Sequence, residues 1–261
     1  MLISRDVFQE QAVEKQVVPE VVPEEKKKAK KIDAVVEFQK LHNTCITLDT
    51  SICPSLSKFQ GILRFLKDIR ISKAITERTV CYRSHLFHFW KHAELSDDEK
   101  IISSTVQVGK ELKPITITEE DIRRVLDLKD KADDPIKLDE RMVRGCFYRM
   151  GYKGDVNKPA LKKGEVPLPY KLLMHALIQS FSHRKAGRDE INDYLANMAM
   201  ALILKKPYNI SKVLFIHMTR NLEVTRLCMY PRFVQMIIDE KYPSIARDPN
   251  DILYLVPFDE S

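Results

Sequence analysis

Residues 102–128 read ISSTVQVGKELKPITITEEDIRRVLDL and hold the strongest β signal in the chain. Ile102–Val108 is rich in β-branched residues, a glycine-lysine pair can form a turn, and Ile115–Thr118 alternates apolar with polar side chains. Two such runs joined by a short turn are typical of a β-hairpin. Thr118 is followed by three acidic residues, a helix N-cap pattern, so the hairpin is predicted to lead into a helix over Asp121–Leu128.

Outside this stretch, apolar residues recur three or four positions apart, which indicates amphipathic helices. Only 7 of the 261 residues are glycine, which disfavours folds built from many tight turns. The fold is therefore predicted to be mainly α, a helical bundle-like domain with one β-hairpin at about 102–118. The predicted helices cover 56–69, 78–93, 139–150, 170–182, 190–204, 211–222 and 232–239, with Pro231 in the first turn of the last. A short strand is predicted at 252–256.

Charge and proline content predict the domain organisation. Residues 1–31 contain the repeat VVPEVVPE at 17–24 and the basic run KKKAKK at 26–31, so we expect a disordered charged extension. An N-terminal helical lobe with the hairpin is predicted at 32–152, and a helical C-terminal lobe at 169–240. The loop 153–168, rich in lysine, proline and glycine, would join them, and an acidic tail would occupy 241–261.

Several classes of protein are disfavoured by composition. No apolar run approaches the 18 residues needed to cross a bilayer, and the N-terminal residues lack the apolar core of a secretory signal. The five cysteines are scattered with no CxxC pair, which favours free thiols in a reducing compartment. We expect an intracellular protein, cytoplasmic or nuclear, with no membrane partner.

Catalytic motifs are missing from the sequence: GxSxG, the P-loop, GxGxxG and HExxH do not occur. We therefore predict no enzymatic activity, no cofactor and no small-molecule substrate. One weak candidate for metal binding is a helical stripe of soft ligands, Cys81, His85, His88 and His92. Because the stripe would extend over about 16 Å of helix, its members cannot all reach one ion. A half-buried polar helix edge is the favoured interpretation, with no metal.

A formal net charge of +6 allows weak attraction to polyanions. The candidate nucleic-acid contacts lie in two groups, although a solvated surface explains either group as well. The first is the basic run of the extension, Lys26, Lys27, Lys28, Lys30 and Lys31. The second is a basic face comprising Arg141, Arg144, Arg149, Lys153, Lys158, Lys162 and Lys163.

Five blocks of sequence resemble the Gag-like region of copia-type plant LTR retrotransposon polyproteins. The blocks are 65–76 with Tyr82 and 89–93; 108–124; 150–152; 209–215 with Met218 and 220–222; and 229–235, which reads MYPRFVQ. Together they extend over about Phe38 to Tyr242. A plant transposon protein domain shares the hairpin-then-helix block and is similar more loosely.

The resemblance implies a structural protein that assembles with copies of itself and packages element RNA, and it supplies no catalytic residue. Protease, integrase, reverse transcriptase and zinc-knuckle signatures have no counterpart in the sequence, so a stand-alone or truncated fragment is expected. Two alternatives stay open. One is a host-adopted protein-interaction or nuclear regulatory module, with the basic run as an import signal. The other is a folded relic without present function.

Overall fold

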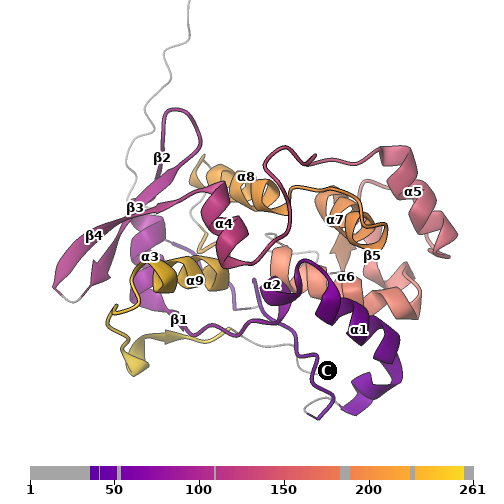
Figure 1. The fold of residues 1–261 in the computed structure, drawn as a ribbon, viewed down its shortest axis with the longest axis horizontal. Coiled ribbons are helices and arrows are strands. Elements are labelled where there is room, and N and C mark those ends of the chain that lie inside the picture. The colour runs from indigo at the N-terminus through magenta and orange to yellow at the C-terminus, as the bar shows by residue number, and fades with distance from the viewer. Residues whose placement is uncertain are drawn as a thin grey trace, which may run out of the picture. The chain divides into compact units, whose positions relative to one another are not determined.

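The computed structural model describes residues 36–40, 42–51, 54–108, 110–182, 189–223 and 227–255. The chain divides into two units, 1–32 and 33–261, and every described residue belongs to the second unit. Helix is the most abundant secondary structure of this part, and its strands form small antiparallel sheets (Figure 1). No described helix has both the length and the apolar character needed to span a membrane.

Most elements follow one another with short connections, and longer ones flank α5 at 126–139 and 150–160. The α-helices are α1 (Gln60–Asp68), α2 (Ser72–Thr76), α3 (Arg83–His92), α4 (Glu119–Val125), α5 (Glu140–Arg149), α6 (Leu168–Phe181), α7 (Asp193–Ile203), α8 (Ile210–Glu223) and α9 (Pro231–Lys241). Short 3-10 helices are η1 (Pro54–Phe59), η2 (Lys163–Glu165) and η3 (Pro249–Asp251). The strands are β1 (Cys81–Tyr82), β2 (Glu94–Leu95), β3 (Ile102–Val108), β4 (Glu111–Ile117), β5 (Leu161–Lys162), β6 (Glu190–Ile191) and β7 (Ile252–Leu253).

The predicted hairpin is confirmed as β3 and β4, paired in register from Ile102–Ile117 to Val108–Glu111. Alternate residues of β3 are buried, so one face of the sheet packs on the protein. That face meets α3, where Ser104 Oγ donates a hydrogen bond to the carbonyl of Phe89 at 2.7 Å. The alternation of apolar side chains thus fixes which face of the hairpin is buried.

Two predicted helices begin later in the structure than their apolar spacing indicates. The helix predicted from residue 78 begins at Arg83, because β1 pairs with β7 and cannot join the helix. The helix predicted from residue 190 begins at Asp193, because β6 pairs with β5 and Asn192 caps the helix. Strand pairing between residues far apart in the chain therefore overrides local helix spacing.

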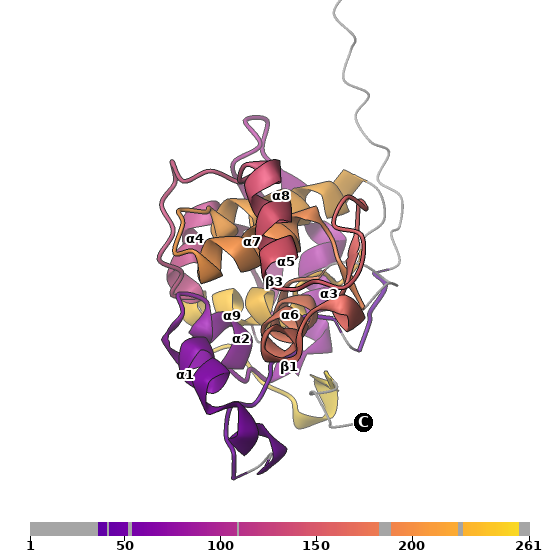
Figure 2. The ribbon, with the colours of Figure 1, turned by 90° about the vertical axis from the view of Figure 1, so that its right-hand side faces the viewer.

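Residues from both sides of the 153–168 loop meet in one core. Helix α4 packs on α8 and α9, and α1 packs on α6. In Figure 1 the hairpin and α5 lie on opposite sides of this core, and in Figure 2 α5 stands in front of α7. Helix α5 therefore offers one face to solvent.

The junction of hairpin and α4 is held by a capping box, as the sequence predicts. Thr118 Oγ1 accepts from the backbone N–H of Asp121 at 3.1 Å, and the Asp121 carboxylate accepts from the N–H of Thr118 at 3.0 Å. Lys241 at the end of α9 donates to the same carboxylate at 2.9 Å. Burial alone would raise the pKa of Asp121, but the hydrogen bonds from Lys241 and Thr118 outweigh it and lower the pKa.

Candidate nucleic-acid interface

The predicted basic face lies on α5 and the loop after it. Arg141 and Arg149 are exposed on the helix, and Lys153 and Lys158 are exposed beyond it. Helix α5 begins here because the Asp139 side chain accepts from the backbone N–H of Met142 at 2.7 Å. The structure therefore leaves these four cations exposed to solvent, on α5 and on the loop that follows it.

An exposed aromatic residue interrupts this face and was missed in the sequence. Tyr148 is 74% exposed, and it lies seven residues after Arg141 and four after Arg144 on α5. Residues at these spacings share one helix face, so the pattern of cation and aromatic ring could have been found from spacing alone. Gly145 lies between them on that face, with open space where a side chain would be. This face of α5 therefore presents the Arg141 cation and the exposed Tyr148 ring, with open space at Gly145 between them.

Other members of the predicted face are partly neutralised. Arg144 is half-buried, and it donates to Glu140 at 2.9 Å and to the carbonyl of Val156 at 3.0 Å. Lys162 forms ion pairs with Asp189 at 3.4 Å and Glu190 at 3.0 Å. A phosphate would have to compete with these partners, so Arg144 and Lys162 contribute less to the face than their charge suggests.

Lys163 is directed into the protein instead of toward solvent. It is half-buried, and its Nζ donates to Nδ1 of His175 on α6 at 3.2 Å. Burial lowers the pKa of Lys163; the charge of Asp189 partly opposes this effect, and Lys171 nearby adds to it. Burial, and then the positive charge of Lys163, lower the pKa of His175 to about 4. This neutral histidine therefore accepts a hydrogen bond from the Lys163 ammonium at neutral pH, and Lys163 is withdrawn from the predicted face.

The lowered pKa of His175 makes the fold sensitive to acid. In the unfolded chain a histidine titrates near 6.5, so between that pH and 4 the unfolded state binds more protons and stability falls as pH falls. We expect His175 to account for a loss of about 2 kcal/mol between pH 7 and 4.5. Urea unfolding of wild type and His175→Gln across this range measures the difference. His92→Gln, at an exposed histidine, is the control, and equal pH slopes in all three proteins would contradict the assignment.

The basic run of the extension, Lys26–Lys31, lies outside the described residues. Its predicted contact with nucleic acid therefore stays a prediction. The acidic tail is described only to residue 255.

The candidate metal stripe is not a single cluster. Cys81 precedes α3 and pairs with Leu253 in a strand, so it does not share the helix face of the three histidines, which corrects the helical placement. Burial raises the pKa of the Cys81 thiol to about 12. Among the described residues, no three metal-ligating side chains lie close enough to hold an ion.

The histidines of the stripe have separate partners. His85 contacts the Gln235 amide and the carbonyl of Ala246, each at 3.1 Å. His88 contacts the hydroxyl of Thr105 at 2.9 Å, and His92 contacts the carbonyl of His88 at 2.9 Å. The contacts of His85 and His88 anchor α3 to its neighbours, and the contact of His92 lies within α3.

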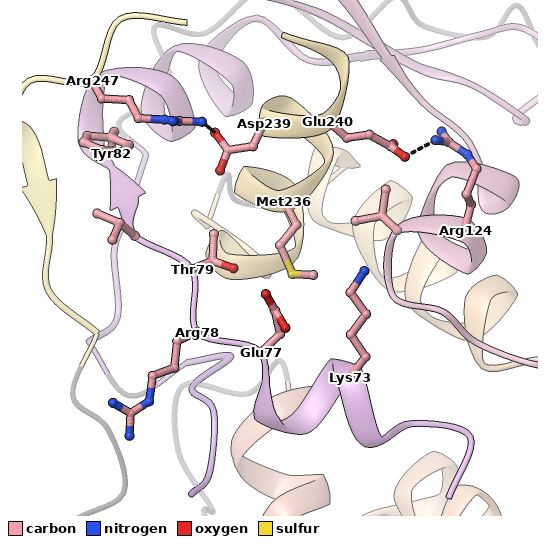
Figure 3. A pocket seen from close by; sticks show the side chains of 12 residues that line it. Lys73, Glu77, Arg78, Thr79, Tyr82, Arg124, Met236, Asp239, Glu240 and Arg247 are labelled. Carbon is pink, nitrogen blue, oxygen red and sulfur yellow. Dashed lines mark hydrogen bonds and ion pairs between the residues drawn. The ribbon is translucent and has the colours of Figure 1, made fainter. Parts of the chain in front are cut away.

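A charged pocket of about 450 Å³ opens beside α2, β1, α4 and α9 (Figure 3). At its edges Arg124 pairs with Glu240, and Arg247 pairs with Asp239 at 3.2 Å. Four cationic and three acidic side chains line it, so its net charge is small. The pocket is therefore expected to attract a polyanion less strongly than the α5 face does.

The conspicuous motif around 209–212 has a structural role. Asn209 Oδ1 accepts from the backbone N–H of Lys212 at 2.8 Å, which caps the start of α8, and Asn209 Nδ2 donates to Glu119 at 2.9 Å. The backbone N–H and the hydroxyl of Ser211 both donate to Asp130, at 2.8 and 2.9 Å. These contacts join α8 to α4 and to the turn after it.

The motif at 229–235 is equally structural. Arg232 is 1% exposed, and it donates from Nε to the carbonyl of Asn43 at 3.1 Å and from Nη1 to the carbonyl of Glu77 at 2.6 Å. Tyr230 is fully buried with a φ of 47°, and its hydroxyl donates to the carbonyl of Phe181 at 3.0 Å. Both side chains are therefore committed to joining distant segments.

Comparison with known proteins does not assign the chain to a family. No family model matches it, and neither a curated protein nor a solved structure matches it. The case for its function is therefore made from the contacts and charges of its own residues.

Proposed function

We propose that the chain is a non-enzymatic, Gag-like structural protein that associates with copies of itself and binds RNA weakly. The motifs that resemble the Gag-like region support a scaffold role, because their polar side chains form helix caps and buried hydrogen bonds. Asn209, Ser211 and Arg232 are examples, since each joins segments far apart in the sequence. A self-assembling protein needs such a rigid scaffold to present the same surface in every copy.

The exposed stripe of α5 is the single observation that carries the RNA part of the proposal. Arg141 and Arg149 can meet phosphates, and binding at each releases counterions from the RNA. The free ring of Tyr148 can stack on a base, as aromatic side chains do in proteins that bind single strands without sequence preference. The combination of cations with an open ring distinguishes this face from an ordinary solvated helix.

Replacing Tyr148 by alanine is expected to weaken the binding of single-stranded RNA about fivefold, because a stacked base contributes at least about 1 kcal/mol. Tyr254→Ala is the matched control, since Tyr254 is 73% exposed and lies on a different segment. Fluorescence anisotropy with a labelled oligonucleotide at fixed salt measures both affinities. Equal affinities for the two variants would rule out stacking at Tyr148.

Replacing Arg141 and Arg149 together by glutamine is expected to lower the slope of log affinity against log salt by about 1.4, since each phosphate contact on a single strand contributes about 0.7. The same measurement on a chain with Lys26–Lys31 changed to glutamine tests the extension. An unchanged slope in either variant removes that group of residues from the RNA contact.

Self-association is tested separately by light scattering of the full chain, after nuclease treatment, over a range of concentrations. We expect the mass to grow with concentration toward defined oligomers. A strict monomer at every concentration and at both low and moderate salt would contradict the assembly part of the proposal, whatever the RNA result.

A further inference from the structure

A second surface, separate from the α5 face, combines positive charge with an apolar floor. A groove of about 650 Å³ lies beside α1 and the C-terminal end of α7. Its apolar side chains come from both helices and from the turn after α1: Phe65, Ile69, Ala201 and Leu202. Its cationic side chains are Arg64, Arg70, Lys129 and Lys205, and its one acidic side chain is Asp68. We call it the α1–α7 groove.

The positive charge of the groove is only partly satisfied within the protein. Arg70 donates to the carbonyl of Lys206 at 2.9 Å, and burial lowers its pKa, although the charges of Asp130 and Asp134 partly oppose that effect. Lys129 pairs with Asp127 outside the groove. Arg64 and Lys205 are exposed and form no ion pair with any described residue. A ligand with carboxylates and apolar side chains would complement both the rim and the floor.

The chain itself contains a segment of that chemistry, which the RNA proposal leaves unexplained. Val17–Glu25 reads VVPEVVPEE and places four valines beside three glutamates, with no cation among them. Val18 and Val22 each precede a proline, and such residues favour an extended backbone over a helix. An extended segment with fixed prolines loses less conformational freedom on binding than an ordinary one. The segment lies outside the described residues, so its match to the groove is a match of composition and charge.

We propose that the Val17–Glu25 segment of one copy binds the α1–α7 groove of a second copy. The inference rests on the proposed self-association and identifies the contact between the two copies. The glutamates meet Arg64 and Lys205 at the rim, and the valines cover the partly exposed side chains of Phe65 and Ile69 on the floor. Contact between a segment and a groove on different copies is heterologous, so each copy can both donate and accept, and the assembly can grow.

A charge swap tests the contact in the full chain. Arg64→Glu with Lys205→Glu reverses the rim, and Glu20→Lys with Glu24→Lys reverses the segment. Each pair alone is expected to lower the association constant at least tenfold by light scattering of nuclease-treated protein. The two pairs together restore opposite charges, so association should return toward the wild-type value. The rim residues are exposed, and a thermal melt of each variant confirms that it folds.

Two further measurements make the result specific. Lys110→Glu with Arg220→Glu makes the same change in net charge at exposed residues outside the groove, and it should leave association unchanged. A labelled peptide of residues 16–25 should bind the chain that carries the reversed segment, and should bind tenfold more weakly when the rim is also reversed.

The outcomes separate this inference from the proposed function. If wild type is a monomer at every concentration, self-association fails and the inference fails with it. If wild type assembles and the single swaps assemble equally well, only the groove contact is wrong. If reversing the rim abolishes RNA binding but leaves assembly and peptide binding intact, the groove is an RNA surface and the peptide proposal is overturned.

Discussion

Replacing Arg232 by methionine is expected to lower the free energy of unfolding by about 3–5 kcal/mol, which corresponds to a decrease in Tm of roughly 10 °C. Arg232 is almost completely buried and donates to four backbone carbonyls, those of Asn43, Thr44, Ala74 and Glu77. Methionine fills a similar volume but donates no hydrogen bond, so these carbonyls would lose a charged donor inside the protein. A buried acceptor left without a donor costs about 1–3 kcal/mol.

Among the described residues, no acidic side chain is hydrogen-bonded to Arg232, since Glu77 accepts through its backbone carbonyl. Burial lowers its pKa to about 10, so the guanidinium stays charged at neutral pH. Two of the carbonyls, those of Ala74 and Glu77, belong to the C-terminal end of α2, where helix carbonyls favour a cation. The guanidinium also lies over the ring of Phe233 at 4.9 Å. One side chain thereby holds α2, α9 and the segment at 43–44 together.

Two control variants make this result specific. Arg220→Met, at an exposed arginine of α8, should change stability by less than about 0.5 kcal/mol. Arg232→Lys should lose an intermediate amount, because an ammonium keeps the charge but cannot reach four carbonyls with the planar geometry of a guanidinium. Urea unfolding monitored by far-UV circular dichroism measures all three. If Arg232→Met and Arg220→Met are equally stable, the hydrogen bonds at Arg232 contribute nothing net.

Replacing Asp130 by alanine is expected to lower the free energy of unfolding by about 3 kcal/mol. The Asp130 side chain is fully buried, and it accepts from Arg123 Nε at 2.9 Å and from the backbone and hydroxyl of Ser211. Its removal leaves the backbone N–H of Ser211, at the start of α8, without this acceptor. Arg123 would keep its ion pairs with Glu119 and Glu120. The contact between α4 and α8 should weaken as a result.

A double-mutant cycle identifies the part of this loss that belongs to Ser211. If the hydroxyl of Ser211 acts through Asp130, the stability lost by the double mutant should be smaller, by about 1 kcal/mol, than the sum of the losses of Ser211→Ala and Asp130→Ala. Asp133→Ala is the control, since Asp133 is exposed and makes no hydrogen bond with a described residue. Strict additivity of the two losses would show that the two residues act independently.

The hairpin and the start of α4 were predictable because their determinants are local. The alternation in β3 and β4 places every second side chain on one face, and Thr118 and Asp121 satisfy each other's backbone groups three residues apart. No distant residue is needed for either feature. The helix stop at Gly151, with a φ of 84°, is local in the same way.

The candidate RNA face was predicted in part, for a related reason. Spacing along α5 places Arg141 on the solvent side, but spacing cannot show that Lys163 turns inward to His175 or that Lys162 meets Asp189 and Glu190. Those partners come from α6 and from the segment before α7. How strongly a surface cation attracts an anionic ligand depends on which acidic side chains lie beside it in space.

The sequence by itself determined the hairpin, the amphipathic helices and the caps, since each depends on residues within a few positions of one another. Only the tertiary structure decided that Cys81 belongs to a strand, that Arg232 is buried, and which cations stay free for a ligand. Some of these contacts join segments more than a hundred residues apart, such as Arg232 with Asn43. No local pattern encodes such a contact, because it exists only after the chain has folded.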